Sequence, residues 1–370
     1  MIFILFSKKK SATGCLVLML ASKVFAALPA AGERTNAAAF LPLISIDWLD
    51  TRSELMAIDL SVTSVNETQN RQSGMQYTVG LDYFRVISSS TRDLATINLQ
   101  PYLAVIRDYP APVPGFYDAP NDWKFIPKIN TINFHLTADR SLNLKVGHLE
   151  LPYGLEATIN NAGELRQFTR AANTGMNADW GVTLNGTLSP IQYEFGVSRG
   201  SGLYYDTQFD PYAIFGRVGT PVDWEGYAGI PEAGLSFFRG RVLSPNGATY
   251  TDRWRVAADG QYHFGLLGIL TEFSGGQDTS FKGVKSDVAN GLLELDLALL
   301  HEALTLYGQG SLYFTRKAGS DWTDKGVVEF GVRWAISSRW TASCQYNEIL
   351  WRPAGTPDVG YLNAQLRFRF

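Results

Sequence analysis

Apolar and polar side chains alternate along most of this chain. The segment YLNAQLRFRF, residues 361–370, places Leu, Ala, Leu, Phe and Phe at every second position, with Asn, Gln and two Arg between them. The same alternation runs through LMAIDLSV (55–62), DWGVTLNGTL (179–188), IQYEFGVS (191–198), GLLELDLAL (291–299) and VVEFGVRWAI (327–336). Successive side chains of a β-strand point to opposite faces, so this period of two predicts strands with one apolar and one polar face.

The length of these runs separates two classes of β protein. Strands of a soluble sandwich run for about five or six residues and bury their apolar face against a second sheet. The runs here extend over about nine to twelve residues, which is the length that crosses a bilayer at a tilt. Their polar face carries Asp, Glu, Arg and Gln and is too hydrated for a packed core. We therefore predict an all-β fold, a transmembrane antiparallel β-barrel.

Sixteen strands account for the alternating runs, although fourteen or eighteen also fit. We expect them at 54–66, 74–88, 94–107, 128–140, 142–153, 178–188, 191–200, 212–220, 232–243, 250–264, 266–275, 288–299, 304–316, 326–337, 340–350 and 360–370. If both ends of the barrel chain are periplasmic, short turns should alternate with longer outer loops. That rhythm holds except at 221–231. Pro101 is a second irregularity, because proline removes a hydrogen bond between paired strands.

The first 26 residues have the layout of a secretory signal peptide. Lysines at 8–10 precede the apolar core CLVLMLA, and VFA supplies a small-residue cleavage site at Ala26. Cys15 lies ahead of that core rather than behind it, which argues against lipidation. We expect residues 27–53 to form a periplasmic lead-in and 54–370 to form the barrel.

The composition of the mature chain restricts the classes of partner that it can be expected to bind. Without the four lysines of the signal peptide, 28 Lys and Arg face 35 Asp and Glu, a net charge of −7. An acidic chain argues against nucleic acid as a partner. Cys344 is the one remaining cysteine, so no internal disulfide is expected. No run approaches the roughly eighteen apolar residues of a membrane helix, which excludes helical spans.

The aromatic residues at 368 and 370 fit closure of the barrel. A sheet survives in hydrocarbon as a closed cylinder, so the last strand should pair with the first. Phe370 would then lie in an aromatic girdle at the periplasmic interface. An alternating strand that carries Phe368 and Phe370 resembles the assembly signal that outer-membrane proteins present to their insertion machinery. Further outward aromatic residues near strand ends are Trp180, Trp254, Phe264, Trp334 and Trp340.

Function should lie in the lumen, because sixteen strands leave an aqueous channel. Alternation predicts an arginine-rich wall on strands 8–10 and an acidic wall on strands 11–14. The arginine-rich wall consists of Arg217, Arg239, Arg241, Arg253 and Arg255. The acidic wall consists of Glu272, Glu294, Asp296 and Glu329, and Lys145 and Arg333 complete the predicted pore wall.

The third outer connection is long, GLEATINNAGELRQFTRAANTGMN at 154–177. A loop of this length in a compact design usually has a function. We expect it to fold inward and constrict the pore, with its charges facing the arginine-rich wall across water. A loop packed on the outer rim is the alternative. The predicted constriction residues are Glu156, Glu164, Arg166, Gln167 and Arg170.

A family resemblance enters at LKVGHLELPYGLE, residues 144–156. This stretch is similar to the vGxfkxPfGlE segment of the phosphate-selective porin O and P family. The matching positions are Gly147, Pro152, Gly154, Leu155 and Glu156, while Glu150 replaces the usual lysine. Members that select phosphate carry many pore lysines, whereas residues 27–370 contain seven lysines. The resemblance therefore implies the fold and a general pore function rather than phosphate selectivity.

We therefore expect a bacterial outer-membrane porin for passive diffusion of small hydrophilic solutes or ions, with a weak preference for anions. Its expected surroundings are outer-membrane lipid and the barrel-insertion machinery. Analogy with porins implies a homotrimer. The alternative is a barrel that sheathes a partner, such as an electron-transfer haem protein. The chain has no Cys-x-x-Cys-His motif, so such haems would belong to a separate subunit.

An outer-membrane enzyme is a further alternative, and we expect the chain not to be one. Its catalytic groups would come from His135, His148, His263 or His301, and none of these lies in a nucleophile motif. No close spacing of His, Cys and Asp predicts a metal site. No cofactor is expected.

Overall fold

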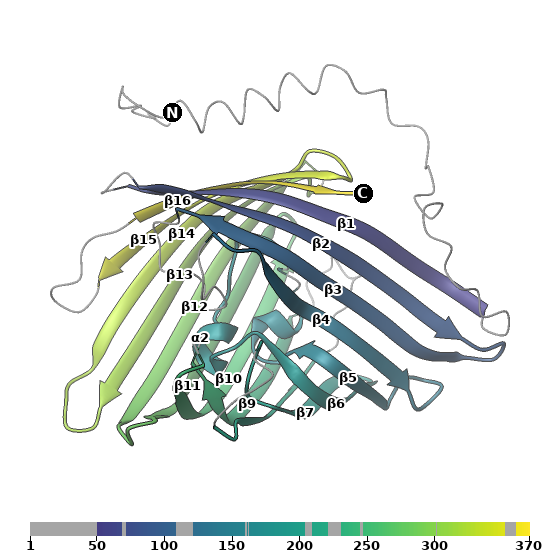
Figure 1. Ribbon diagram of the computed structural model, residues 1–370, viewed down its shortest axis with the longest axis horizontal. Helices are drawn as coiled ribbons and strands as arrows, with labels where there is room; N and C mark the ends of the chain where they lie inside the picture. Colours follow the sequence, from purple (N-terminus) through teal and green to yellow (C-terminus); the bar gives the residue numbers. More distant parts are fainter. Residues whose placement is uncertain are drawn as a thin grey trace, which may run out of the picture. The chain divides into compact units, whose positions relative to one another are not determined.

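A computed structural model of the chain describes residues 50–68, 72–108, 121–159, 161, 163–203, 209–220, 231–244, 247–300, 302–351 and 360–370. Across these ranges the chain forms sixteen β-strands that pair in chain order in a closed antiparallel ring (Figure 1). The predicted barrel and its strand number are confirmed. The predicted signal peptide, the lead-in up to residue 49, and His301 lie outside the described residues.

The strands match their predicted positions with ends shifted by a few residues. Their bounds are β1 (Asp50–Glu67), β2 (Ser73–Ser88), β3 (Asp93–Arg107), β4 (Lys124–His135), β5 (Asn143–Glu150), β6 (Ala178–Leu188), β7 (Ile191–Ser198), β8 (Tyr212–Gly219), β9 (Glu232–Leu243), β10 (Tyr250–Phe264), β11 (Leu267–Ser280), β12 (Lys285–Leu299), β13 (Leu304–Lys317), β14 (Thr323–Ala335), β15 (Trp340–Trp351) and β16 (Gly360–Arg369).

The two ends of the barrel differ in their connections. At one end the turns are short, for example 189–190 between β6 and β7 and 265–266 between β10 and β11. We call this the short-turn end, and the opposite end, which carries the connection at 151–177, the long-loop end. Pro101 lies within β3, where the pairing with β4 shifts register between Gln100 and Pro101. This irregularity accommodates the missing proline N–H.

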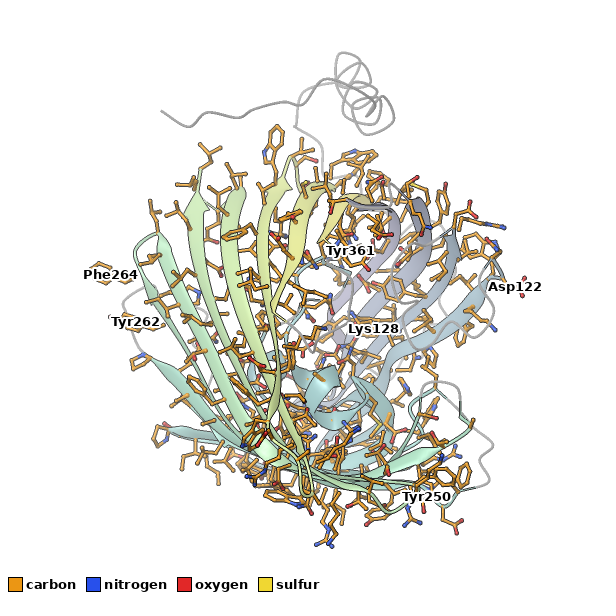
Figure 2. All side chains as sticks on the ribbon, turned by 90° about the vertical axis from the view of Figure 1, so that its left-hand side faces the viewer. Asp122, Lys128, Tyr250, Tyr262, Phe264 and Tyr361 are labelled. Atoms are coloured by element: carbon orange, nitrogen blue, oxygen red, sulfur yellow. The ribbon has the colours of Figure 1, made fainter. Side chains whose placement is uncertain are left out.

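The outer face of the strands is apolar. Leu235, Phe264 and Phe273 each expose more than 60% of their surface, whereas Asp59 and Glu294 on the inner face are buried. Figure 2 shows Tyr262 and Phe264 projecting away from the wall at one end of β10, with Tyr250 at the other end. An apolar exterior with aromatic residues near its edges is suited to lipid. Among the described residues, no helix has the length and apolar character needed to span a membrane.

The last strand closes the ring against the first. Ile58 N–H donates to the carbonyl of Phe370 at 2.8 Å, and Phe370 N–H donates to the carbonyl of Ile58 at 3.1 Å. The aromatic ring of Phe368 lies 4.5 Å from that of Trp340 and 5.2 Å from that of Phe370, measured between centroids. The backbone groups at this edge are therefore paired, as hydrocarbon requires.

The third loop, residues 151–177 in the structure, folds into the ring. It contains a short 3₁₀ turn, η3 (Leu155–Ala157), and a short helix, α2 (Arg170–Thr174). Figures 1 and 2 both show α2 within the ring of strands. Leu155 and Phe168 of the loop form an apolar cluster with Leu270 and Leu292 of the wall. The loop thus packs on the inner face of β11 and β12 rather than on the outer rim.

Candidate pore constriction

Glu272 on β11 anchors the base of the third loop. Its carboxylate accepts hydrogen bonds from the Leu155 N–H at 3.0 Å, from the Asn173 amide at 3.0 Å, and from the hydroxyl of Thr169. Gly154 precedes this contact with a φ of 61°, and a Cβ there would collide with the Glu272 carboxylate. Only glycine combines this backbone conformation with so close an approach.

Asn173 links the loop helix to two strands through its side chain and to a third through its backbone. Its amide oxygen accepts hydrogen bonds from Ser274 Oγ at 2.7 Å and from Asn290 Nδ2 at 2.6 Å. The carbonyl of Asn173 also accepts a bond from Arg253 Nη1 at 3.1 Å. The alternation did not reveal this residue, because an isolated asparagine in a polar loop carries no signal of its partners. Its three strand contacts hold α2 against β10, β11 and β12.

Two of the predicted constriction residues brace the loop from within. Glu156 accepts a bond from the Arg170 N–H at 2.9 Å, and Arg170 Nη1 donates to the carbonyl of Leu151 at 3.0 Å. The side chains of Glu156 and Arg170 are both buried. Arg170 Nη2 also lies 3.5 Å from a carboxylate oxygen of Glu150. These contacts stabilise the inward fold of the loop.

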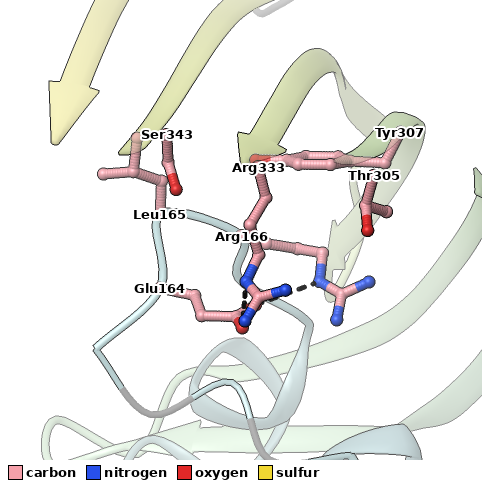
Figure 3. A pocket seen from close by; sticks show the side chains of 7 residues that line it. All are labelled: Glu164, Leu165, Arg166, Thr305, Tyr307, Arg333 and Ser343. Carbon is pink, nitrogen blue, oxygen red and sulfur yellow. Dashed lines mark ion pairs between the residues drawn. The ribbon is translucent and has the colours of Figure 1, made fainter. Parts of the chain in front are cut away.

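The tip of the loop carries charges to the inner face of β12 and β14, and Figure 3 shows the part of this contact that Glu164 makes with Arg333 and Arg166. Arg166 Nη1 donates to Glu294 Oε1 at 2.9 Å and to Asp296 Oδ2 at 3.3 Å, both on β12. Glu164 Oε1 lies 3.2 Å from Arg333 Nε on β14, and its other oxygen lies 3.6 Å from Arg166 Nε. The loop tip is therefore joined to the inner wall by an alternating row of opposite charges.

Arg166 keeps its charge in this setting. Burial works against the charged form, but Glu294, Glu164 and Asp296 outweigh it and raise the pKa of Arg166 above its ordinary value. Its guanidinium also lies 5.3 Å from the centroid of the Phe168 ring and 5.9 Å from that of Tyr307. Gln167 is exposed and donates to the carbonyl of Glu164 at 3.0 Å. A gap of about 60 Å³ remains between the loop tip and Tyr307.

The other predicted pore-wall residues are paired with opposite charges or amides. The alternation predicted a basic wall on strands 8–10 and an acidic wall on strands 11–14. In the structure the two charges are mixed, and separate walls do not form. The shortest contacts are Lys145–Glu194 at 2.8 Å, Arg217–Asp259 at 2.6 Å, Arg255–Asp278 at 2.8 Å and Gln345–Glu329 at 2.8 Å, with Arg253–Asp278 longer at 3.7 Å. These partners lie on other strands, so the single-strand pattern could not reveal them.

Arg239 and Arg241 contradict their predicted place in the pore wall. They lie on the outer face of β9, which also carries Leu235 and Phe237, while Phe238 is buried on the inner face. The adjacent Phe237 and Phe238 gave β9 an apolar residue on each face, so its sequence did not distinguish inside from outside. Near the end of a strand, an outward arginine can reach the polar edge of a membrane.

Two of the histidines considered for catalysis contact neighbouring strands. His135 Nε2 lies 3.0 Å from Thr96 Oγ1, and His148 Nδ1 lies 2.9 Å from the carbonyl of Lys128. His263 is exposed near the end of β10. Across the described ranges, no group of three or more His, Cys, Asp or Glu residues is placed to hold a metal ion.

No family model matches the chain, and no curated protein matches its sequence. Solved structures match its fold over most of its length. An anion-selective porin from Comamonas acidovorans aligns with a TM-score of 0.60 at 13% identity, covering 86% of this chain and 99% of that one. The fold is that of the bacterial outer-membrane porins.

Two other solved structures agree with this assignment. The Pseudomonas putida OprB at high pH aligns with a TM-score of 0.60 at 10% identity, covering 86% of this chain and 94% of that one. A trimer form of OmpT, an outer membrane protein of Vibrio cholerae, aligns with a TM-score of 0.57 at 11% identity, covering 86% and 99%. At these identities the likeness concerns the fold of porins in general, and the narrower resemblance to the phosphate-selective family stays a prediction.

Proposed function

We propose that this porin-fold chain forms a water-filled channel in the bacterial outer membrane, through which small hydrophilic solutes and ions diffuse passively. The observation that carries the proposal is the position of the third loop. It lies inside the ring, and its tip is joined to the inner wall by the Glu164–Arg333 and Arg166–Glu294 pairs. A loop fixed at this place narrows the lumen: its apolar side chains pack against the inner face of β8 to β12, while its tip carries the charged pairs. Gln167, Arg333 and Arg166 are then the constriction residues that solutes meet.

We propose a weak preference for anions. The ion pairs that join the loop tip and the closing strand to the rest of the wall include Arg166–Glu294, Arg333–Glu164, Arg367–Asp59 and Arg369–Asp82. In each of these pairs the guanidinium is more exposed than the carboxylate, as with Arg369 at 42% against Asp82 at 6%. Ions would therefore meet cationic surface first at the loop tip and at the seam, whereas Asp278, at 26%, is more exposed than its partners Arg253 and Arg255 and keeps the preference small. The name of the Comamonas porin, an anion-selective one, is in keeping with this expectation.

We propose that the functional unit is a homotrimer, in line with the trimer form of the Vibrio cholerae protein of similar fold. The sheath around a haem protein receives less support. Such a partner would need the interior of the ring, and in this chain the third loop packs there against β11 and β12. Native mass spectrometry of the detergent-extracted protein would test the trimer.

Liposome swelling tests the channel. Vesicles that contain the folded protein should swell in neutral sugars, with a rate that falls as the sugar becomes larger. The variant Glu164→Gln with Arg166→Gln removes the charges that hold the loop tip, so it should admit larger sugars than the wild type. Vesicles with folded protein that swell no faster than empty vesicles would refute the channel.

A further inference from the structure

On the outer face of β8 to β11, the two rows of side chains nearest the long-loop end contain charged, amide and hydroxyl groups beside Ile214 and Trp254, and we call them the polar rows. The pairing of the strands places these outward side chains in rows across the sheet. The row nearest the loops contains Tyr212, Arg241, Asp252 and Thr279, and the next contains Ile214, Arg239, Trp254 and Gln277. The two rows below them contain Gly216, Phe237, Val256 and Gly275, then Val218, Leu235, Ala258 and Phe273.

A groove of about 470 Å³ lies over the two polar rows. We call it the arginine groove, and its outward lining is Tyr212, Arg239, Arg241, Trp254, Gln277 and Thr279, together with Asp252. In contrast to the inner wall, it is built on the face that carries Leu235 and Phe237. It therefore lies on the outside of the barrel, at the level where the apolar band ends.

The two arginines of the groove are held differently. Arg241 donates to Asp252 through Nε at 2.8 Å and through Nη2 at 3.3 Å, and its guanidinium lies 4.4 Å from the centroid of the Tyr250 ring. Arg239 is exposed, and among the described residues it makes no ion pair. One guanidinium is thus fixed in place and the other is available to a ligand.

A guanidinium at the edge of a lipid-facing surface favours an anionic partner. Its planar set of donors matches phosphate oxygens in a bidentate arrangement. Thr279 adds a hydroxyl to the groove, and Gln277 keeps one amide N–H beside the one that it donates to Asp287 at 3.1 Å. The rows directly below carry Phe237, Leu235 and Phe273 for contact with acyl chains. In outer-membrane barrels the longer loops face outward, so the groove would meet the outer leaflet.

We propose that the arginine groove binds the phosphate headgroup of an anionic lipid of the outer leaflet, with the acyl chains along the rows of Phe237 and Leu235. Arg239 is the principal phosphate ligand, and Arg241, whose charge is balanced by Asp252, offers its remaining N–H donors from a fixed position. This inference rests on membrane insertion of the barrel but not on conduction. A free phosphate ion would use the two polar rows alone, whereas a lipid uses all four rows.

Native mass spectrometry of the detergent-solubilised protein tests the proposal. The wild type is titrated with a short-chain phosphatidic acid, with a phosphatidylcholine of the same chains, and with inorganic phosphate as competitor. We expect retention of phosphatidic acid over phosphatidylcholine, and no displacement by inorganic phosphate at matched concentration. Loss of one charge-assisted contact in Arg239→Gln should weaken retention about tenfold. Arg239→Lys keeps the charge, so its retention of phosphatidic acid should be weakened less than that of Arg239→Gln.

Arg85 provides a matched control. It lies on the outer face of β2 near the short-turn end, beside Tyr83, so Arg85→Gln removes the same charge from the same face but outside the groove. This variant should retain phosphatidic acid like the wild type, and the channel conductance of Arg239→Gln should be unchanged. Equal retention of phosphatidic acid by folded Arg239→Gln and wild type would overturn the proposal. So would displacement by inorganic phosphate, or an oligomer that excludes the lipid because a second copy covers the groove.

Discussion

Arg367 on the last strand donates from Nε to both carboxylate oxygens of Asp59 on the first strand, each at 2.9 Å. Asp59 also accepts a bond from the hydroxyl of Tyr102 at 3.0 Å, and the neighbouring Arg369 donates to Asp82 on β2. The seam of the barrel is thus joined on its inner face by charged groups and on its backbone by Phe370 and Ile58. Both side-chain and backbone hydrogen bonds therefore close the barrel.

Asp59→Asn should weaken this seam. It removes the carboxylate that pairs with the largely buried Arg367 guanidinium, which costs about 3 kcal/mol of unfolding free energy. Urea titration of the protein in lipid vesicles measures this loss. The double variant with Arg367→Gln should lose less than the sum of the single losses, because the two residues interact directly. Additive losses would show that the pair does not act as a unit.

Gly154→Ala should release the third loop. The alanine must adopt a positive φ at a cost of about 1–3 kcal/mol, and its Cβ displaces the Glu272 carboxylate that holds the loop. We expect larger or noisier single-channel conductance. Gly283→Ala is the control, since Gly283 has a φ of 79° but no atom within 4 Å of the place that a Cβ would take. If both variants behave alike, backbone strain rather than the loop anchor is responsible.

Arg333→Gln should reduce the preference for anions. Arg333 is the more exposed member of its pair with Glu164, so its removal leaves a carboxylate facing the lumen. The reversal potential in a salt gradient should move toward cation selectivity. Arg85→Gln removes a charge from the outer face and should leave the reversal potential unchanged. An unchanged potential in Arg333→Gln would place the selective charges elsewhere.

Phe368→Ala should impair assembly in cells. The ring of Phe368 packs between those of Trp340 and Phe370 on the outer face near the seam. We expect less folded barrel in the outer membrane, measured by the heat-dependent shift of folded barrels on gels. Refolding of the purified variant into vesicles should be affected less, if Phe368 serves the insertion machinery. Equal defects in both assays would assign Phe368 a role in stability alone.

Much of the fold could be predicted from the sequence, and the reason is local. Whether a side chain faces lipid or lumen follows from the period of two within one strand, so Leu293 and Glu294 received opposite faces correctly. The local signal failed on β9, where Phe237 and Phe238 are adjacent. For Arg217 it indicated the inner face but not the partner, Asp259, which lies 42 residues away on a strand that is not its neighbour. Which side chains meet across the lumen depends on how the strands are arranged around the ring. The alternation within one strand carries no information on that arrangement.

The third loop illustrates the same limit. Its length and position indicated an inward loop, and five of its polar residues were expected at the constriction. Glu156 and Arg170 instead satisfy each other within the loop, while Arg166 and Glu164 reach the wall. Which polar residues brace a loop and which face the lumen depends on its folded path. That path is set by anchoring hydrogen bonds, such as the one from Asn173 of the loop to Glu272 of the wall.

Planar-bilayer recording of the purified, folded wild type tests the central claim most directly. If the chain forms a porin channel, insertion should produce discrete conductance steps in potassium chloride, with a small preference for anions in a salt gradient. A correctly folded barrel that inserts into the bilayer, as verified by its resistance to protease, and yet gives no conductance steps would contradict the account.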